Sequence, residues 1–130
     1  MTKEKSSMAR ILCVDDNVSV LEMLALVVTR CGHHVVTCSS VSEAREKLAT
    51  GGVDAVLSDW KLTDGSGQDV VKAAKASGDV PVAIISGYTH DAFQAVEPLA
   101  DFFLEKPFSS EELFSLVKDL LLLREKKSVG

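Results

Sequence analysis

The stretch DAVLSDWKLTDG, from Asp54 to Gly65, contains a short apolar run that ends abruptly on an acid, Asp59. A near-continuous apolar run of this length is typical of a strand buried on both faces of a parallel sheet. Acids seldom lie at the lip of such a strand, because a charge close to a core is costly unless it is paired. The stretch therefore predicts a parallel α/β sheet, and it raises the question of what Asp59 does at the sheet's edge.

The same kind of strand recurs along the chain and alternates with segments of helical period. The five expected strands are Arg10–Val14, His34–Cys38, Asp54–Ser58, Pro81–Ile85 and Asp101–Glu105. The five expected helices are Val18–Arg30, one opened by a capping box of Ser40 with Glu43, Gln68–Ser77, Thr89–Val96, and one from Ser109 or Ser110 to about Glu125. This alternation predicts a doubly wound five-stranded parallel sheet of flavodoxin-like order 2-1-3-4-5.

Length and composition limit the classes of protein that fit. A chain of 130 residues makes one compact domain, and a net charge of −5 argues against nucleic acid as a direct partner. No apolar run approaches the roughly 20 residues of a membrane span, and the three cysteines form no CxxC pair, so we expect free thiols and a cytoplasmic protein. We expect a disordered lead over residues 1–8, one domain over residues 9–126 and a flexible tail over residues 127–130.

Polar side chains follow the carboxyl ends of the first, third, fourth and fifth strands, which lie side by side in this order, and ligands bind at that end in sheets of this kind. They are Asp15 and Asp16 after the first strand, Asp59 after the third, Ser86 after the fourth and Lys106 after the fifth. Three crowded carboxylates need positive charge nearby, and oxygen-only ligands favour Mg²⁺. A carboxylate held in such a site can attack a phosphoryl group and form an aspartyl-phosphate. These five residues form a polar rim at the carboxyl edge of the sheet, and their combination predicts metal-assisted phosphoryl transfer onto Asp59.

Four segments of the chain, CVDDN, LSDWKLTDGSG, IISG and FFLEKPF, together resemble the receiver domain of two-component response regulators of the stand-alone, single-domain type. The resemblance extends from about Ala9 to Arg124. It implies that Asp59 takes a phosphoryl group from a phosphohistidine on a histidine kinase or a histidine phosphotransfer protein. It also implies a cis peptide bond between Lys106 and Pro107, since X–Pro bonds tolerate that form.

The resemblance further implies a role for each residue of the rim. The Mg²⁺ ligands would be Asp15, Asp16, Asp59 and the backbone carbonyl of Lys61, with Mn²⁺ able to substitute for Mg²⁺. Ser86 would be the switch hydroxyl, Phe103 the switch aromatic residue, and Lys106 the lysine that neutralises the phosphoryl group. The family often has Thr and Tyr at the two switch positions, and Met-Pro where this chain has Leu62-Thr63. These departures remove no group that phosphorylation needs, but they leave the output of the switch open.

Two further sets of residues are predicted to shape signalling. Met23 and Leu26 fall on the water face of the first helix, which suggests docking of a histidine-bearing helix pair. Lys61 and Tyr88 each lie two residues beyond a rim residue, and we expect their bulk to slow hydrolysis of the phosphoryl group, which small replacements at both positions would test. The downstream target is expected to be a protein. A monomer, or a weak dimer through the fourth helix, fifth strand and fifth helix, fits the leucine run 120–123.

Three other functions fit the sequence less well. A haloacid-dehalogenase-like phosphatase also uses a strand-end Asp, but it needs an acid two residues later, where this chain has Lys61. A flavodoxin-like cofactor binder needs a phosphate-cradling loop after the first strand, and this chain has none. Asp15 and Asp16 at that position would also repel the phosphate of FMN. A degenerate receiver that only binds partners is disfavoured, since every reactive group is present. The sequence thus predicts a phosphoacceptor domain rather than an enzyme, whether alone or cut from a longer regulator or hybrid kinase.

Overall fold

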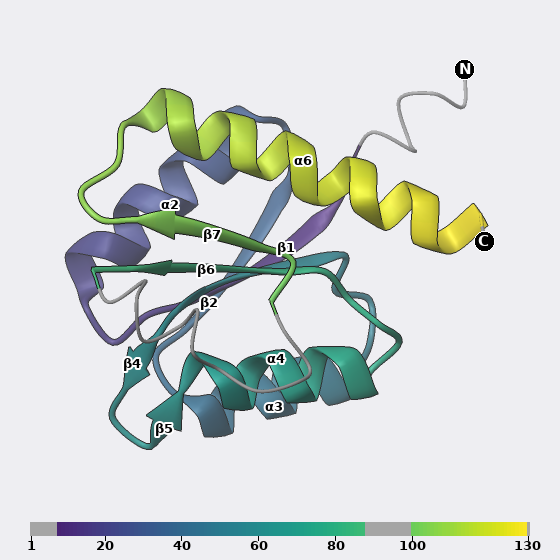
Figure 1. Cartoon of the computed structure of the whole chain (residues 1–130), viewed down its shortest axis with the longest axis horizontal. Helices are drawn as coiled ribbons and strands as arrows, with labels where there is room; N and C mark the ends of the chain where they lie inside the picture. Colours follow the sequence, from purple (N-terminus) through teal and green to yellow (C-terminus); the bar gives the residue numbers. More distant parts are fainter. Residues whose placement is uncertain (1–7, 88–99, 130) are drawn as a thin grey trace.

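The computed structural model of this chain describes residues 8–87 and 100–129, and it shows a parallel sheet of five strands between two layers of helices (Figure 1). The strands are β1 (Arg10–Val14), β2 (His34–Cys38), β3 (Ala55–Asp59), β6 (Val82–Ser86) and β7 (Phe102–Glu105). Every neighbouring pair is parallel, and the order across the sheet is β2-β1-β3-β6-β7. This is the order 2-1-3-4-5 that the sequence predicts, so the fold class is confirmed.

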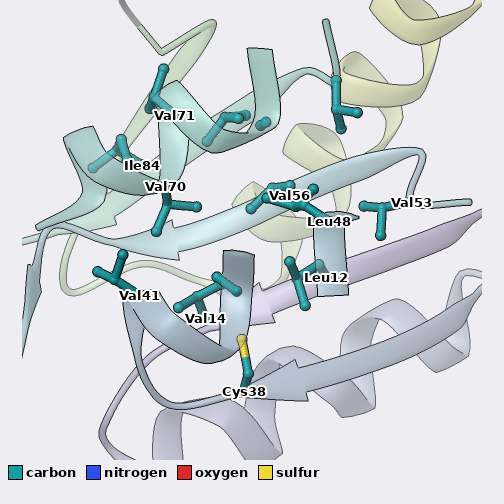
Figure 2. Packing of buried hydrophobic residues seen from close by; sticks show 14 of the residues in the cluster. Leu12, Val14, Cys38, Val41, Leu48, Val53, Val56, Val70, Val71 and Ile84 are labelled. Carbon is teal, nitrogen blue, oxygen red and sulfur yellow. The ribbon is translucent and has the colours of Figure 1, made fainter. Parts of the chain in front are cut away.

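In the described part of the chain, two helices cover each face of the sheet (Figure 1). On one face lie α2 (Val18–Arg30) and α6 (Ser110–Val129), and on the other lie α3 (Val41–Ala49) and α4 (Gly67–Ala76). Successive side chains of a strand point to opposite faces, so the two apolar cores alternate along β1. Ile11 and Cys13 join the core under α2 and α6, whereas Leu12 and Val14 join the core under α3 and α4 (Figure 2).

Polar side chains fix the point at which each helix begins. The side chain of Asn17 accepts from Val20 N at the start of α2, and Ser40 Oγ accepts from Glu43 N at the start of α3. The expected capping box at Ser40 is only half formed, because the Glu43 carboxylate accepts from Ser39 N instead of Ser40 N. Side-chain caps of this kind bind backbone N–H groups that have no partner within the helix. They set where each helix begins relative to the strand end before it.

The structure corrects the expected end of the last helix. We expected a helix to about Glu125 and a flexible tail from residue 127, but α6 continues to Val129. Its last turns are tied to loops at the amino ends of the strands, since Lys127 Nζ lies 3.0 Å from Asp79 Oδ1 and Arg124 Nε lies 3.7 Å from Asp54 Oδ1. The charged residues at the end of the sequence do not by themselves indicate these ion pairs, because their partners lie far away in the chain.

Other element boundaries also differ from expectation, and one element was missed. Strand β3 includes Asp59 itself, paired with Ile85, because the ladder to β6 continues through that residue. A short antiparallel hairpin follows, formed by β4 (Lys61–Leu62) and β5 (Gly65–Ser66), which the sequence analysis did not predict. The helix expected over Thr89–Val96 lies outside the described residues. Within the described ranges, no helix combines the length and apolar content that crossing a membrane requires.

Candidate phosphoryl-acceptor site

The carboxyl edge of the sheet brings three acidic side chains together. Asp15 follows β1, Asp16 comes next, and Asp59 is the last residue of the neighbouring strand β3. One carboxylate oxygen from each of the three lies within 4.8 Å of the others. The sequence-predicted metal ligands Asp15, Asp16 and Asp59 therefore do converge, because adjacent parallel strands end side by side.

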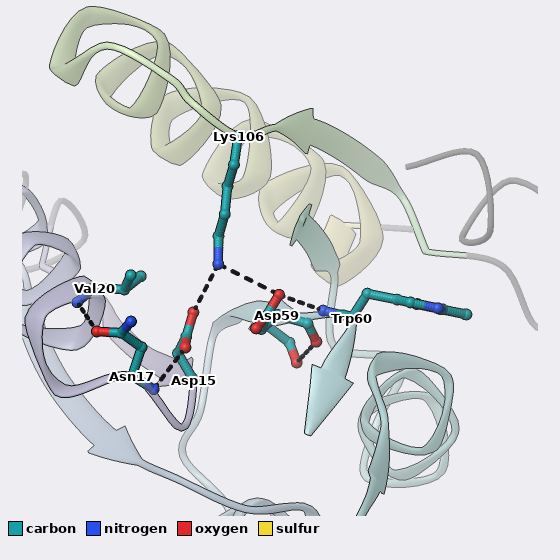
Figure 3. A network of polar contacts seen from close by, with 7 residues as sticks. Asp15, Asn17, Val20, Asp59, Trp60 and Lys106 are labelled. Carbon is teal, nitrogen blue, oxygen red and sulfur yellow. Dashed lines mark hydrogen bonds and ion pairs between the residues drawn. The ribbon is translucent and has the colours of Figure 1, made fainter. Parts of the chain in front are cut away.

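Lys106 lies directly after β7 and reaches across the edge of the sheet to these acids (Figure 3). Its Nζ lies 3.3 Å from Asp15 Oδ2 and 3.5 Å from Asp59 Oδ1. The Asp15 side chain is almost fully buried, whereas the Lys106 side chain is about a quarter exposed, so the ion pair joins a buried acid to a lysine that still reaches solvent. One cation thus bridges two acids, and the peptide bond from Lys106 to Pro107 is cis, as the sequence analysis expected.

Backbone N–H groups orient both of these carboxylates (Figure 3). Asp15 Oδ1 accepts from Asn17 N at 2.9 Å, and Asp59 Oδ1 accepts from Trp60 N at 2.8 Å. Each bond comes from the chain just after the acid, so the local backbone fixes the side-chain direction. The two acids are therefore held in place before any ligand arrives, which is what a binding site for a charged group requires.

The electrostatic environment makes Asp59 an unusual acid. Burial raises the pKa of Asp59 above its ordinary value, and the nearby charge of Asp15 raises it further. The Lys106 ammonium and the Trp60 N–H oppose both effects by favouring the charged form, but they do not cancel them. A hard divalent cation would relieve the remaining repulsion. The oxygen-only donor set of Asp15, Asp16 and Asp59 fits Mg²⁺, which prefers carboxylates and water.

The two predicted switch residues lie on β6, the neighbour of β3, and on β7, the strand beyond it. Ser86 is fully buried as the last residue of β6, and its carbonyl accepts from Lys106 N at 3.0 Å. Phe103 is partly buried on β7, opposite Ile84 of β6, and it packs against the core under α3 and α4. The register of β6 and β7 therefore places the hydroxyl at the rim and the aromatic ring deeper in the sheet, on one pair of neighbouring strands.

The surface residues predicted to tune signalling are found in different settings. Met23 and Leu26 are exposed on α2, with 37% and 51% of their surface accessible. Lys61 is exposed at the start of β4, and Tyr88 lies outside the described residues. In the leucine run, Leu122 is 56% exposed and Leu120 is buried, as a run spanning more than one helix face requires. Val18 and Phe114 are also exposed apolar residues, which the sequence analysis did not single out.

Two residues with clear structural roles near the site were not predicted. A Cβ added to Gly67 would lie 2.8 Å from Asp59 O and 2.7 Å from Ile84 Cδ1, so α4 begins directly against the strand that carries Asp59. Asp64 was given no role, but its carboxylate accepts from Val41 N and Ser42 N of α3. The sequence signal for Gly67 is a glycine at the first position of a helix, and Asp64 gives no comparable signal.

Comparison with known proteins shows which family has this arrangement. The model of the response regulator receiver domain matches residues 11–118, which is most of the chain. The chain belongs to the response regulator receiver domain family. Among its relatives, the phosphate regulon transcriptional regulatory protein PhoB of Klebsiella pneumoniae is 32% identical over 117 residues. The response regulator protein PilR of Pseudomonas aeruginosa is 36% identical over 121 residues, which cover 91% of this chain and 27% of PilR.

Solved structures of receiver domains share the fold. The CheY-like receiver domain protein of Methanospirillum hungatei JF-1 superposes with a TM-score of 0.84 at 26% identity, covering 93% of this chain and 99% of that one. The response regulator TrrA of Thermotoga maritima, solved in complex with Mg²⁺-BeF, gives a TM-score of 0.80 at 30% identity, covering 88% of this chain and all of that one. The receiver chain spans 51% of the length of PhoB, with 86% of this chain matched. It is therefore similar to the receiver part of these longer regulators.

Proposed function

We propose that this receiver domain accepts a phosphoryl group on Asp59 from a phosphohistidine of a histidine kinase or histidine phosphotransfer protein. The observation that carries the proposal is the position of the Lys106 ammonium between the carboxylates of Asp15 and Asp59. A lysine in this place can neutralise a phosphoryl oxygen that arrives beside Asp59. The three clustered acids supply the negative charge that a divalent cation needs, so the site can lower the repulsion between a carboxylate and a phosphoryl group.

The transfer itself needs only a few groups of this chain. A carboxylate oxygen of Asp59 attacks phosphorus, the P–N bond of the donor breaks, and its electron pair returns to the imidazole. Lys106 holds charge on the phosphoryl oxygens throughout, and the Ser86 hydroxyl donates to one of them once its loop has moved inward. Asp15, Asp16, Asp59 and the carbonyl of Lys61 would hold Mg²⁺, which supplies charge neutralisation when bound. Later attack by water on phosphorus releases inorganic phosphate and restores Asp59, so the domain resets its own state.

Trp60 gives a direct test of the proposed function, because it is the one tryptophan of the chain and follows Asp59. Titration with Mg²⁺ should change its fluorescence, and acetyl phosphate added afterwards should change it again. Mn²⁺ is expected to replace Mg²⁺ in the first step. Mass spectrometry should then find one added phosphoryl group in the wild type and none in Asp59→Ala. A wild-type protein that gains no phosphoryl group from acetyl phosphate or from a phosphorylated histidine donor would contradict the proposal.

The signal is proposed to leave the site through Ser86 and Phe103. Movement of the Ser86 hydroxyl toward the phosphoryl group vacates space, and the Phe103 ring fills that space, which shifts the population of a second surface state. We expect Phe103→Ala to be phosphorylated at the wild-type rate while phosphorylation no longer strengthens binding of the downstream target. Equal gains in target affinity on phosphorylation of Phe103→Ala and the wild type would rule out this role.

The donor protein is proposed to dock on the exposed apolar residues of α2, which begins close to the acids. We expect Met23→Asp and Leu26→Asp to slow transfer from a phosphohistidine protein by about tenfold or more, since losing a central apolar contact costs over 1 kcal/mol. Phosphorylation by acetyl phosphate, which needs no docking, should stay unchanged. Leu122→Asp is a matched control, because it places the same charge at an exposed leucine of α6. Equal slowing by Leu122→Asp would contradict docking on α2.

Two further properties are proposed, the lifetime of the phosphoryl group and a weak dimer. Slow hydrolysis of the phosphoryl group is proposed to depend on the exposed side chain of Lys61, together with Tyr88. A weak dimer is proposed to use β7 and α6, where Leu122 is exposed beside a groove that is also lined by Phe102 and Lys126. Measurement of the hydrolysis rate after small replacements, and of the mass in solution for Leu122→Asp, would test each one separately.

A further inference from the structure

The hairpin of β4 and β5 carries the chain directly away from the acceptor residue. Lys61 is two positions beyond Asp59 and pairs with Ser66, while Leu62 pairs with Gly65. The base of the hairpin is closed by Gly67 N, which donates to Trp60 O at 2.7 Å. Only two residue pairs hold the hairpin together, and a ribbon so short has little stability of its own in water. Its shape must therefore depend on contacts with the rest of the domain.

The tip of the hairpin is tied to a different helix by Asp64. Asp64 Oδ1 accepts from Val41 N at 2.8 Å, and Asp64 Oδ2 accepts from Ser42 N at 3.0 Å. These are the first two N–H groups of α3, which have no acceptor within their own helix. The two bonds hold the pKa of Asp64 below its ordinary value, as expected for a carboxylate whose charged form is bound. They join segments that are more than twenty residues apart in the sequence.

The contact around Asp64 is close-packed as well as hydrogen-bonded. Leu62 is buried in the same apolar core as Val41. A Cβ on Gly65 would lie 3.1 Å from Val41 Cγ2 and 2.6 Å from Asp69 Oδ2, and its φ of +159° lies at the edge of the range that favours glycine. The tip is therefore packed so closely at Gly65 that a side chain there would displace it. Loss of the two hydrogen bonds would remove the polar contact that ties the tip to α3.

We infer that Asp64 is a positioning residue for the metal ligand at Lys61: by anchoring the hairpin to α3, it holds the Lys61 carbonyl beside Asp59. The inference rests on the proposed function, because it assumes that this carbonyl is a ligand of Mg²⁺. The two side-chain ligands on either side have their own supports, since Asp59 is paired in the sheet and Asp15 is bound by Asn17 N. Lys61 is the first residue of the hairpin and pairs with Ser66, so its carbonyl moves with the hairpin that Asp64 anchors. Ligand positions must be held to within roughly half an ångström.

A simpler role for Asp64 would be to stabilise α3 alone, and the chain offers a matched control for it. Ser40 caps the same helix, because Ser40 Oγ accepts from Glu43 N, and among the described residues no hydrogen bond joins the Ser40 side chain to the hairpin. If Asp64 only stabilised α3, Ser40→Ala and Asp64→Ala would have the same consequences. If Asp64 positions the hairpin, only Asp64→Ala should change the metal site. Asp64→Asn keeps one acceptor oxygen and should fall between Asp64→Ala and the wild type.

The test measures Mg²⁺ binding by Trp60 fluorescence, and amide hydrogen exchange of the hairpin without metal. We expect Asp64→Ala to bind Mg²⁺ about tenfold more weakly, the lower end of the loss seen when a residue supporting a metal ligand is removed. Hairpin amides should exchange faster in Asp64→Ala, while Ser40→Ala keeps wild-type Mg²⁺ affinity and hairpin exchange despite a lower melting temperature. Wild-type Mg²⁺ affinity in a folded Asp64→Ala, or equal weakening by Ser40→Ala, would overturn the inference.

The same experiment separates this inference from the proposed function. Absence of Mg²⁺ binding in the wild type would count against the proposed function, whereas hydrogen exchange without metal would still report on the anchor. Unchanged hairpin exchange in Asp64→Ala would overturn the positioning role even if the wild type binds Mg²⁺ and accepts a phosphoryl group. Faster exchange together with weaker Mg²⁺ binding supports it.

Discussion

Asp59→Asn is expected to reduce phosphorylation by acetyl phosphate to below detection while making the metal-free protein more stable. The amide has no oxygen nucleophilic enough to attack phosphorus, so the acceptor is lost. The amide oxygen can still accept from Trp60 N, and the half-buried charge beside Asp15 is removed. We expect the melting temperature in EDTA to rise by a few degrees, because removing one repelling charge from a crowded acidic cluster favours the folded state.

The gain in stability should depend on pH in a defined direction. The pKa of Asp59 is raised in the folded protein above its ordinary value of 3.8, first by burial and then by Asp15. Above the folded pKa the charged Asp59 destabilises the wild type in full. As pH falls through the folded pKa toward 3.8, the folded protein binds the proton first and the penalty disappears. The advantage of Asp59→Asn in urea unfolding should therefore be largest at neutral pH and shrink on acidification.

Asp15→Asn is the matched control for this experiment. It removes a neighbouring carboxylate and relieves the same repulsion, but it leaves the acceptor in place. We expect Asp15→Asn also to raise the melting temperature in EDTA, while phosphorylation is slowed by weaker Mg²⁺ binding and remains measurable. Full loss of phosphorylation in Asp15→Asn together with normal phosphorylation of Asp59→Asn would mean that the acceptor is misassigned.

The main lines of the fold and the acidic rim could be predicted because they follow from local sequence patterns. Buried parallel strands are apolar throughout, so β1 and β6 are recognisable without any knowledge of their neighbours. The crossover rules leave few strand orders, and the flavodoxin-like order chosen among them brings the strand ends that carry Asp15, Asp59 and Lys106 to one edge of the sheet. The short distances of Lys106 Nζ from the two acids are a consequence of that topology.

The features that were missed depend on contacts between segments far apart in the chain. In the sequence, Asp64 has only the pattern of a turn residue. Its role becomes visible when α3 is placed beside it, because its partners are two backbone N–H groups more than twenty residues away. The sequence of the last turns of α6 resembles a charged tail. The ion pairs of Lys127 with Asp79 and Asp101, which the sequence does not show, tie these turns to the domain. Hydrogen bonds and ion pairs of this kind leave no periodic pattern in the sequence. They are set by how the elements pack together.

Lys106→Met should change metal binding and phosphorylation in opposite directions, which makes it the sharpest test of how the site works. The ammonium group now lies 3.3 Å from Asp15 Oδ2 and 3.5 Å from Asp59 Oδ1, where it competes with any second cation. Methionine has nearly the same length and no charge. The three acids should then bind Mg²⁺ several-fold more tightly, as measured by Trp60 fluorescence, because less positive charge opposes the incoming ion.

Phosphorylation of Lys106→Met by acetyl phosphate should fall by about a hundredfold even with Mg²⁺ saturating. Removing a single group that stabilises transition-state charge typically costs a factor of about 10² to 10³ in rate. The control is Lys118→Met, which removes an equal charge from an exposed position of α6. Tighter Mg²⁺ binding with an unchanged phosphorylation rate would show that Lys106 only balances the charge of the acids. Weaker Mg²⁺ binding would mean instead that Lys106 holds Asp15 and Asp59 in the geometry that the metal requires.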